Sequence, residues 1–254
     1  MGNIQSLAST SLAILKIIYD HPNSIDLSIN IEELAYLANR LSVQPAVSVA
    51  ISVALPILSD IIFEEPFPFL LAGRTLEHRE LYTEAFTLVV ARWNFEEYRD
   101  IWEPGMEEKD NELWGLIWLG YNQVGKLEQS VFDWIFEKYG KDEESMRKLS
   151  KRAEKATKSK WKEVDTHATA NTYRFVLDRL LKRGDRAKEW EIHLIEEIES
   201  LLKSNLTVDK NRAAGLGDCE HLFLCVTVED EDLPWGDARP ETRVWPWESE
   251  LAYW

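Results

Sequence analysis

Apolar side chains separated by three or four residues recur along most of this chain, and that spacing lines one face of an α-helix. In the clearest example, Asn30 precedes Glu33 in the pattern of a capping box, whose two side chains bond to the backbone at a helix start. The apolar series there is Ile31, Leu34, Leu37, Ala38 and Leu41. The sequence therefore predicts a mainly α fold.

Proline, glycine and capping residues divide this pattern into separate helices. We expect Pro45 to end or kink the first helix, Thr75 to cap the next, and Asp185 to cap the last. Residues 111–139 are helical in pattern, and residues 142–162 form a basic helix. The glycines expected to break or end helices are Gly120, Gly125, Gly140 and Gly184.

Three regions follow from this division. We expect an N-terminal apolar arm at residues 1–24, a helical globular domain at 25–205, and an irregular tail at 206–254. The tail is acidic and rich in tryptophan and proline. Within it, Leu222 to Val228 favours β structure, so one short strand is expected there.

Charge is distributed unevenly along the 254 residues, whose formal net charge is −16. Residues 1–140 carry −12, residues 141–212 carry +4 and residues 213–254 carry −8. Acidic surfaces repel nucleic acids and anionic lipids, so only the middle block favours such partners. Two cysteines and no recognisable secretory leader indicate a reducing compartment, and we expect a cytoplasmic protein.

The N-terminal sequence Met1-Gly2-Asn3-Ile4-Gln5-Ser6 matches the pattern for N-myristoylation of Gly2. Only glycine offers the acyltransferase an amine beside a carbon that has no side chain. The alternative is an unmodified start whose match arose by chance. One acyl chain binds membranes weakly, at about 10⁴ M⁻¹, so an anchor here needs a second signal.

A dense basic run between residues 147 and 162 is the first candidate for that signal. Its cations are Arg147, Lys148, Lys151, Arg152, Lys155, Lys158, Lys160 and Lys162. A helix carrying them would attract an anionic membrane surface, at about 1 kcal/mol per cation, and less favourably the phosphates of a nucleic acid. The alternative is a solvated helix face that pairs with acidic regions of the same protein.

Residues 41–59 form an uncharged stretch of 19 residues, close to the length of about 20 that spans a bilayer. Pro45, Pro56 and four serines argue against a permanent transmembrane helix. The favoured interpretation is a buried helix or strand of the core. The alternative is a segment that enters a membrane after the protein rearranges.

Motifs of catalysis are missing from the sequence: it has no glycine-rich phosphate loop, Gly-x-Ser-x-Gly pattern or His-Glu-x-x-His pattern. Cys219, His221 and Cys225 lie close together, but a structural zinc site needs four ligands and these residues fall in a β-favouring run. We therefore expect no catalytic residues, no cofactor and no metal site.

The tail holds four of the 11 tryptophans: Trp235, Trp245, Trp247 and Trp254. These aromatic side chains are candidates for binding a partner, because such anchors contribute much of the energy when a peptide docks in a groove. The alternative is that the tail folds back and covers an apolar patch of its own body.

Together these features predict a non-enzymatic peripheral membrane protein that acts as a scaffold or assembles, anchored by acylated Gly2 and the basic run. A viral matrix or minor capsid protein, which self-associates, is one setting for this combination, by analogy alone. The alternatives are a soluble helical protein-interaction module and a membrane-perturbing protein that uses residues 41–59. Expected partners are an anionic membrane surface and another protein or a second copy.

Overall fold

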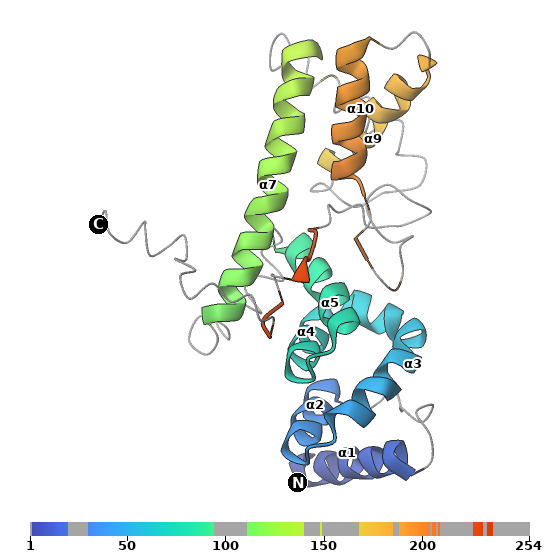
Figure 1. Ribbon diagram of the computed structural model, residues 1–254, viewed down its shortest axis with the longest axis vertical. Helices are drawn as coiled ribbons and strands as arrows, with labels where there is room; N and C mark the ends of the chain where they lie inside the picture. Colours follow the sequence, from blue (N-terminus) through green and yellow to red (C-terminus); the bar gives the residue numbers. More distant parts are fainter. Residues whose placement is uncertain are drawn as a thin grey trace, which may run out of the picture. The chain divides into compact units, whose positions relative to one another are not determined.

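The computed structural model describes only part of the chain (Figure 1). The described residues are 2–19, 30–93, 111–139, 148, 168–184, 188–203, 205–206, 208, 226–230 and 233–235. They form eight helices and, within these ranges, no strand, which confirms the predicted mainly α fold.

Two compact units make up the chain, and each is described by itself. The first contains Met1–Val89, Trp93–Leu119 and Thr227–Trp254. The second contains Val90–Arg92 and Gly120–Val226. Helix α7 (Asn111–Tyr139) begins in the first unit and continues into the second.

In the described ranges, five helices precede α7, and they lie in the first unit except for the last turn of α5. They are α1 (Gly2–Tyr19), α2 (Ile31–Arg40), α3 (Gln44–Glu64), α4 (Pro66–Thr75) and α5 (Arg79–Arg92). Helix α1, in the region expected to be an arm, packs against α2 and α3. From residue 81 to residue 89, α5 is buried on all sides, as is typical of a central core helix.

Helix α2 begins where its capping residue predicts. The Asn30 side chain accepts hydrogen bonds from the backbone N–H groups of Glu32 and Glu33, at 3.0 and 3.1 Å. The helix ends at Arg40, and Ser42 then adopts a left-handed conformation with φ of 55°. Pro45 lies in the first turn of α3, where its missing N–H has no helical partner to lose.

Other expected boundaries are wrong. Thr75 is the last residue of α4, and α5 begins after His78. Gly120 and Gly125 lie inside α7, which is continuous. Glycine in a helix interior costs about 1 kcal/mol but keeps its backbone N–H, so packing along a helix of 29 residues outweighs it.

The second unit packs three helical segments around one core. They are residues 120–139 of α7, α9 (Ala168–Leu181) and α10 (Glu189–Leu201). The core side chains are Val131, Ile135, Tyr173, Val176, Leu180, Leu194, Ile198, Leu201 and Leu202. Gly184, which was predicted to end this helix, lies three residues after its last residue and has φ of 51°.

The strand expected in the tail is described only in part, and two residues expected to cap or end helices are not described. Residues 226–228 of the expected strand at Leu222–Val228 form no strand, and residues 222–225 lie outside the described ranges. Asp185 and Gly140 also lie outside them. Lys188 precedes α10, and its backbone N–H donates to the Glu191 carboxylate at 2.8 Å.

Candidate functional site

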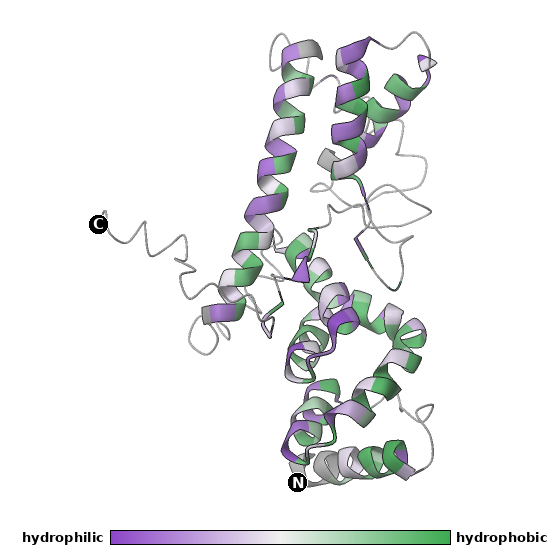
Figure 2. Cartoon of the chain, in the orientation of Figure 1, coloured by the Kyte–Doolittle hydropathy of each residue, from purple (hydrophilic) through white to green (hydrophobic). Residues whose placement is uncertain are grey.

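Helix α1 carries apolar side chains on two sides. Thr10, Ala13, Ile14 and Ile17 are buried. On the other side, exposed apolar residues form what we term the α1 apolar face: Leu12, Leu15, Ile18 and Tyr19, each between 42% and 81% exposed. Lys16 is the one charged side chain in the sequence of this helix, which begins at Gly2 (Figure 2).

Helix α3 repeats this arrangement. One side is buried, through Val47, Ala50, Ile51, Leu55, Leu58 and Ile62. Three exposed residues spaced four apart form the α3 apolar face: Val49, Val53 and Ile57, each between 48% and 66% exposed. Residues 41–59 thus supply a core helix with one buried side rather than a strand, and that helix also displays apolar side chains to solvent.

By length and composition, Gln44–Glu64 is a helix that could cross a membrane. Core helices of soluble proteins share these properties, and α3 is partly buried in its own unit. Its length therefore carries no argument by itself. The exposed side chains of Val49, Val53 and Ile57 are a stronger argument, because apolar surface that faces water is typical of interaction sites.

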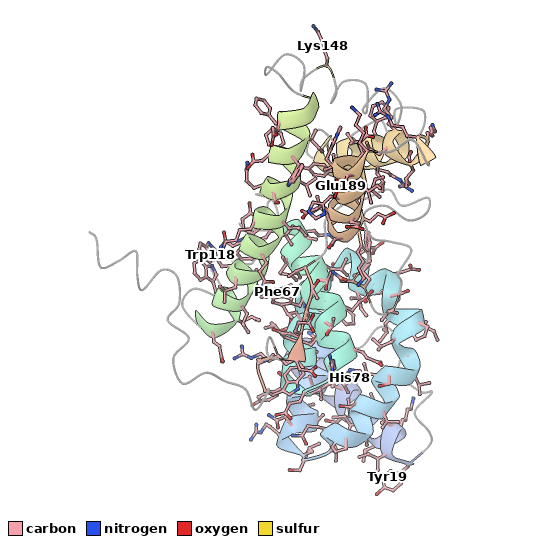
Figure 3. All side chains as sticks on the ribbon, turned by 45° about the horizontal axis from the view of Figure 1, so that its top comes forward. Tyr19, Phe67, His78, Trp118, Lys148 and Glu189 are labelled. Carbon is pink, nitrogen blue, oxygen red and sulfur yellow. The ribbon has the colours of Figure 1, made fainter. Side chains whose placement is uncertain are left out.

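His78 connects α3 to the beginning of α5, and its side chain is nearly buried (Figure 3). Its Nε2 atom lies 2.8 Å from Ser52 Oγ and 3.2 Å from the carbonyl oxygen of Ser48. Its Nδ1 atom accepts a hydrogen bond from the backbone N–H of Leu81 at 3.3 Å. The imidazole thereby caps α5 and bonds to α3 at once.

These contacts assign the proton of the neutral imidazole. Since Nδ1 accepts from Leu81, the hydrogen is on Nε2, which donates toward Ser52 Oγ. The Ser52 hydroxyl in turn donates to the Ser48 carbonyl at 3.1 Å. A nucleophilic serine needs a histidine nitrogen that accepts its proton, and this arrangement is the reverse. The cluster is a structural connection between two helices.

Burial lowers the pKa of His78, and the nearby Glu80 carboxylate and backbone hydrogen bonds oppose that effect. The ring is therefore neutral at pH 7, in agreement with its bonding. The sequence offered two signals that could have identified this site: a histidine between two helical patterns, and serines four residues apart in an uncharged stretch.

The structure describes few of the site residues predicted from sequence. Gly2 is the first residue of α1. Of the eight basic residues, only Lys148 is described, and it is exposed. The others (Arg147, Lys151, Arg152, Lys155, Lys158, Lys160 and Lys162) lie outside the described residues.

Trp235 is half-buried and contacts Tyr82, whereas Trp245, Trp247 and Trp254 lie outside the described part of the chain. Cys219, His221 and Cys225 lie outside it too. Within the part that is described, no group of three or more His, Cys, Asp or Glu side chains is placed to hold a metal ion.

In the second unit, the buried Glu191 forms an ion pair with Arg183 and accepts the hydrogen bond from Lys188. Tyr173 donates a hydrogen bond to Glu128 at 3.3 Å, and burial together with that carboxylate raises the pKa of Tyr173. The buried side chains of Glu191 and Tyr173 both have hydrogen-bond partners, and this bonding indicates a role in stability.

Comparisons of this chain with models of protein families, with curated proteins and with solved structures found no match. The features of the chain that bear on function are the apolar faces of α1 and α3 and the His78 cluster.

Proposed function

We propose that this chain is a non-enzymatic peripheral membrane protein that contacts a bilayer through the apolar faces of α1 and α3, with an acyl chain on Gly2 as its anchor. One observation carries the proposal. Seven exposed apolar side chains lie on two helices that pack against each other, and residues 2–19 and 41–59 contain a single charged residue, Lys16. The chain as a whole is acidic, with a formal net charge of −16.

The energies involved are sufficient for reversible binding. Full burial of a Leu, Ile or Val side chain contributes about 1.5–3 kcal/mol, so each half-exposed residue adds about 1 kcal/mol when the bilayer covers it. A myristoyl chain alone gives an association constant of about 10⁴ M⁻¹. The apolar faces thus provide the second signal that stable anchoring needs, and the basic run at residues 147–162 would add attraction to anionic lipid.

The scarcity of charge in residues 2–19 and 41–59 also favours a membrane over an acidic or basic protein partner. A bilayer interior accepts apolar side chains and excludes ionised ones. The setting we propose for this docking is a scaffold or assembly role, of the kind found in viral matrix or minor capsid layers, and it rests on analogy.

A second candidate function is membrane perturbation by α3. It is supported by the α3 apolar face together with the length and composition of Gln44–Glu64, which would suffice to cross a bilayer once the helix leaves its unit. The two candidates differ in whether α3 stays packed against the other helices of its unit.

The faces can be tested by removing one side chain from each. We expect the double variant Leu15→Ser and Ile57→Ser to bind phosphatidylcholine vesicles at least about tenfold more weakly than the parent, since two apolar contacts are lost. Leu181→Ser with Ile192→Ser is the matched control, because both residues are 49% exposed and belong to the second unit. Equal losses in the two variants would remove the faces from the proposal.

A further inference from the structure

We propose that His78 is a pH-sensitive latch that holds α3 to the beginning of α5 when neutral and releases α3 when protonated. The latch depends on the proposed function in one respect only: the proposed function supplies the bilayer that the released α3 would enter. Its operation within the protein depends on three hydrogen bonds and the burial of one ring.

In the neutral state both ring nitrogens are used. Nε2 faces Ser52 Oγ and the Ser48 carbonyl on α3, and Nδ1 accepts from Leu81 N–H on α5. The two bonds to α3 bridge 26 and 30 residues of sequence, so they join separate helices. His78 is only 7% exposed, so water competes little for these bonds.

Protonation breaks this arrangement at Nδ1. Imidazolium carries a hydrogen on both nitrogens, so Nδ1 can no longer accept from Leu81 N–H and the two hydrogens oppose each other. The new positive charge also lies at the start of α5, where the helix dipole is positive and disfavours a cation. The first turn of α5 then loses its cap. Nε2 keeps its hydrogen and can still donate to α3, so the release of α3 follows from the lost cap and from the buried charge, which draws His78 toward water.

Helix α3 is weak at the position where the latch holds it. Pro56 lies inside the helix and has no N–H to donate to the carbonyl of Ser52, four residues earlier. Ser52 is thus both the contact of His78 and the site of a missing helical hydrogen bond. Loss of the His78 contact therefore removes support at a point where α3 already lacks one helical hydrogen bond.

The charged groups around the His78 ring do not cancel the cost of protonating it in its buried position. Glu80 on α5 favours the protonated form. Residues 41–59, which include most of α3, bring no ionisable side chain, while Arg74 of α4 pairs with Glu112 at 3.0 Å and Arg79 pairs with Asp230. The hydrogen bond to the Ser48 carbonyl of α3 also favours the protonated form, but burial outweighs it and Glu80 together, because the net effect lowers the pKa of His78 from 6.5.

The sign of the pH dependence follows from that direction. The folded protein binds fewer protons at His78 than the unfolded chain does, so the contribution is complete above pH 6.5. It is lost as the pH falls below 6.5 toward the lowered folded value, which means that release occurs on the acid side.

The test is hydrogen exchange of the full chain at about pH 7.5 and about pH 5, corrected for intrinsic rates. In the parent we expect the acid sample to lose at least about tenfold protection in α3 and in the first turn of α5. In His78→Gln we expect no such loss, because the amide nitrogen lies near the position of Nε2 and does not titrate. His193→Gln is the matched control: His193 is exposed and contacts Glu196, so this variant should respond as the parent does.

A second variant keeps the test decisive if His78→Gln does not fold. In His78→Asn the side-chain oxygen lies near the position of Nδ1 and can cap α5 without titrating. Either variant must abolish the acid response in α3. Unchanged α3 protection in the acid parent, or an acid response retained in a folded His78 variant, overturns the latch.

Vesicles of phosphatidylcholine separate the latch from the proposed function. If α3 opens in acid and the parent then binds these vesicles more tightly than His78→Gln does, both stand. If α3 opens in acid but the parent binds vesicles at neither pH, the latch stands and the membrane function fails. If vesicles bind but α3 protection is the same at both pH values, the latch fails and the docking function stands.

Discussion

The ring of Trp235 packs edge-on against the ring of Tyr82, with centroids 5.2 Å apart and planes inclined at 77°. Tyr82 is fully buried in α5, and Leu233 and Pro234 beside the tryptophan are buried as well. This part of the C-terminal region therefore covers the core of the first unit. This contact is of the kind that the second alternative describes, while partner binding by the tail tryptophans stays a prediction.

The Trp235 contact predicts a cost for removing its ring. Trp235→Ala should lower the free energy of unfolding by about 1–3 kcal/mol, because it removes a half-buried aromatic ring and an edge-to-face pair. Urea denaturation of the full chain measures this, with Leu181→Ala as the control that shortens an exposed apolar side chain. Equal midpoints for Trp235→Ala and the parent would show that the ring contributes nothing to the core.

Two glycines should respond in opposite directions to the same substitution. A Cβ on Gly73 would lie 2.8 Å from the backbone nitrogen of Tyr82 and 2.9 Å from its Cα, so α4 and the chain at Tyr82 would have to separate. Gly73→Ala should therefore destabilise the protein by about 1–3 kcal/mol.

A Cβ on Gly125 would meet nothing within 4 Å. Gly125→Ala should stabilise the continuous helix α7 by about 0.5–1 kcal/mol. Thermal unfolding of the pair measures both effects, and a shift of the same sign in the two variants would contradict the packing described for them.

The buried carboxylate of Glu191 predicts a third effect. Glu191→Ala should cost about 1–3 kcal/mol, because the Lys188 N–H loses its acceptor at the first turn of α10 and Arg183 loses its partner. Glu189→Ala, an exposed change in the same turn, should shift stability by less than about 0.5 kcal/mol. Chemical denaturation distinguishes them, and matching midpoints would refute the capping role.

Sequence patterns predicted the features that depend on contacts within a few residues. Asn30 caps α2 through its side-chain oxygen, and the left-handed Gly184 lies three residues after the end of α9. Gly120 and Gly125 did not break α7, since packing along a long helix outweighs a small local cost.

The same limit explains what was missed at the candidate site. His78 caps α5 through its local bond to Leu81, but its ring also bonds to Ser52, which is 26 residues away, and no local pattern contains that second contact. The uncharged stretch at 41–59 was compatible with a helix or a strand, since apolar composition alone has no period that separates them. Its exposed face appears only once the buried face is known.

Flotation of the parent and of Gly2→Ala on vesicles, each produced in a eukaryotic host and checked by mass spectrometry, tests the membrane account most directly. Alanine fits the first turn of α1, so the fold should be the same in both. We predict a myristoyl group on the parent alone and at least about tenfold less flotation for Gly2→Ala, because the apolar faces act together with the chain. An unmodified Gly2, or equal flotation of the two proteins, would contradict the account.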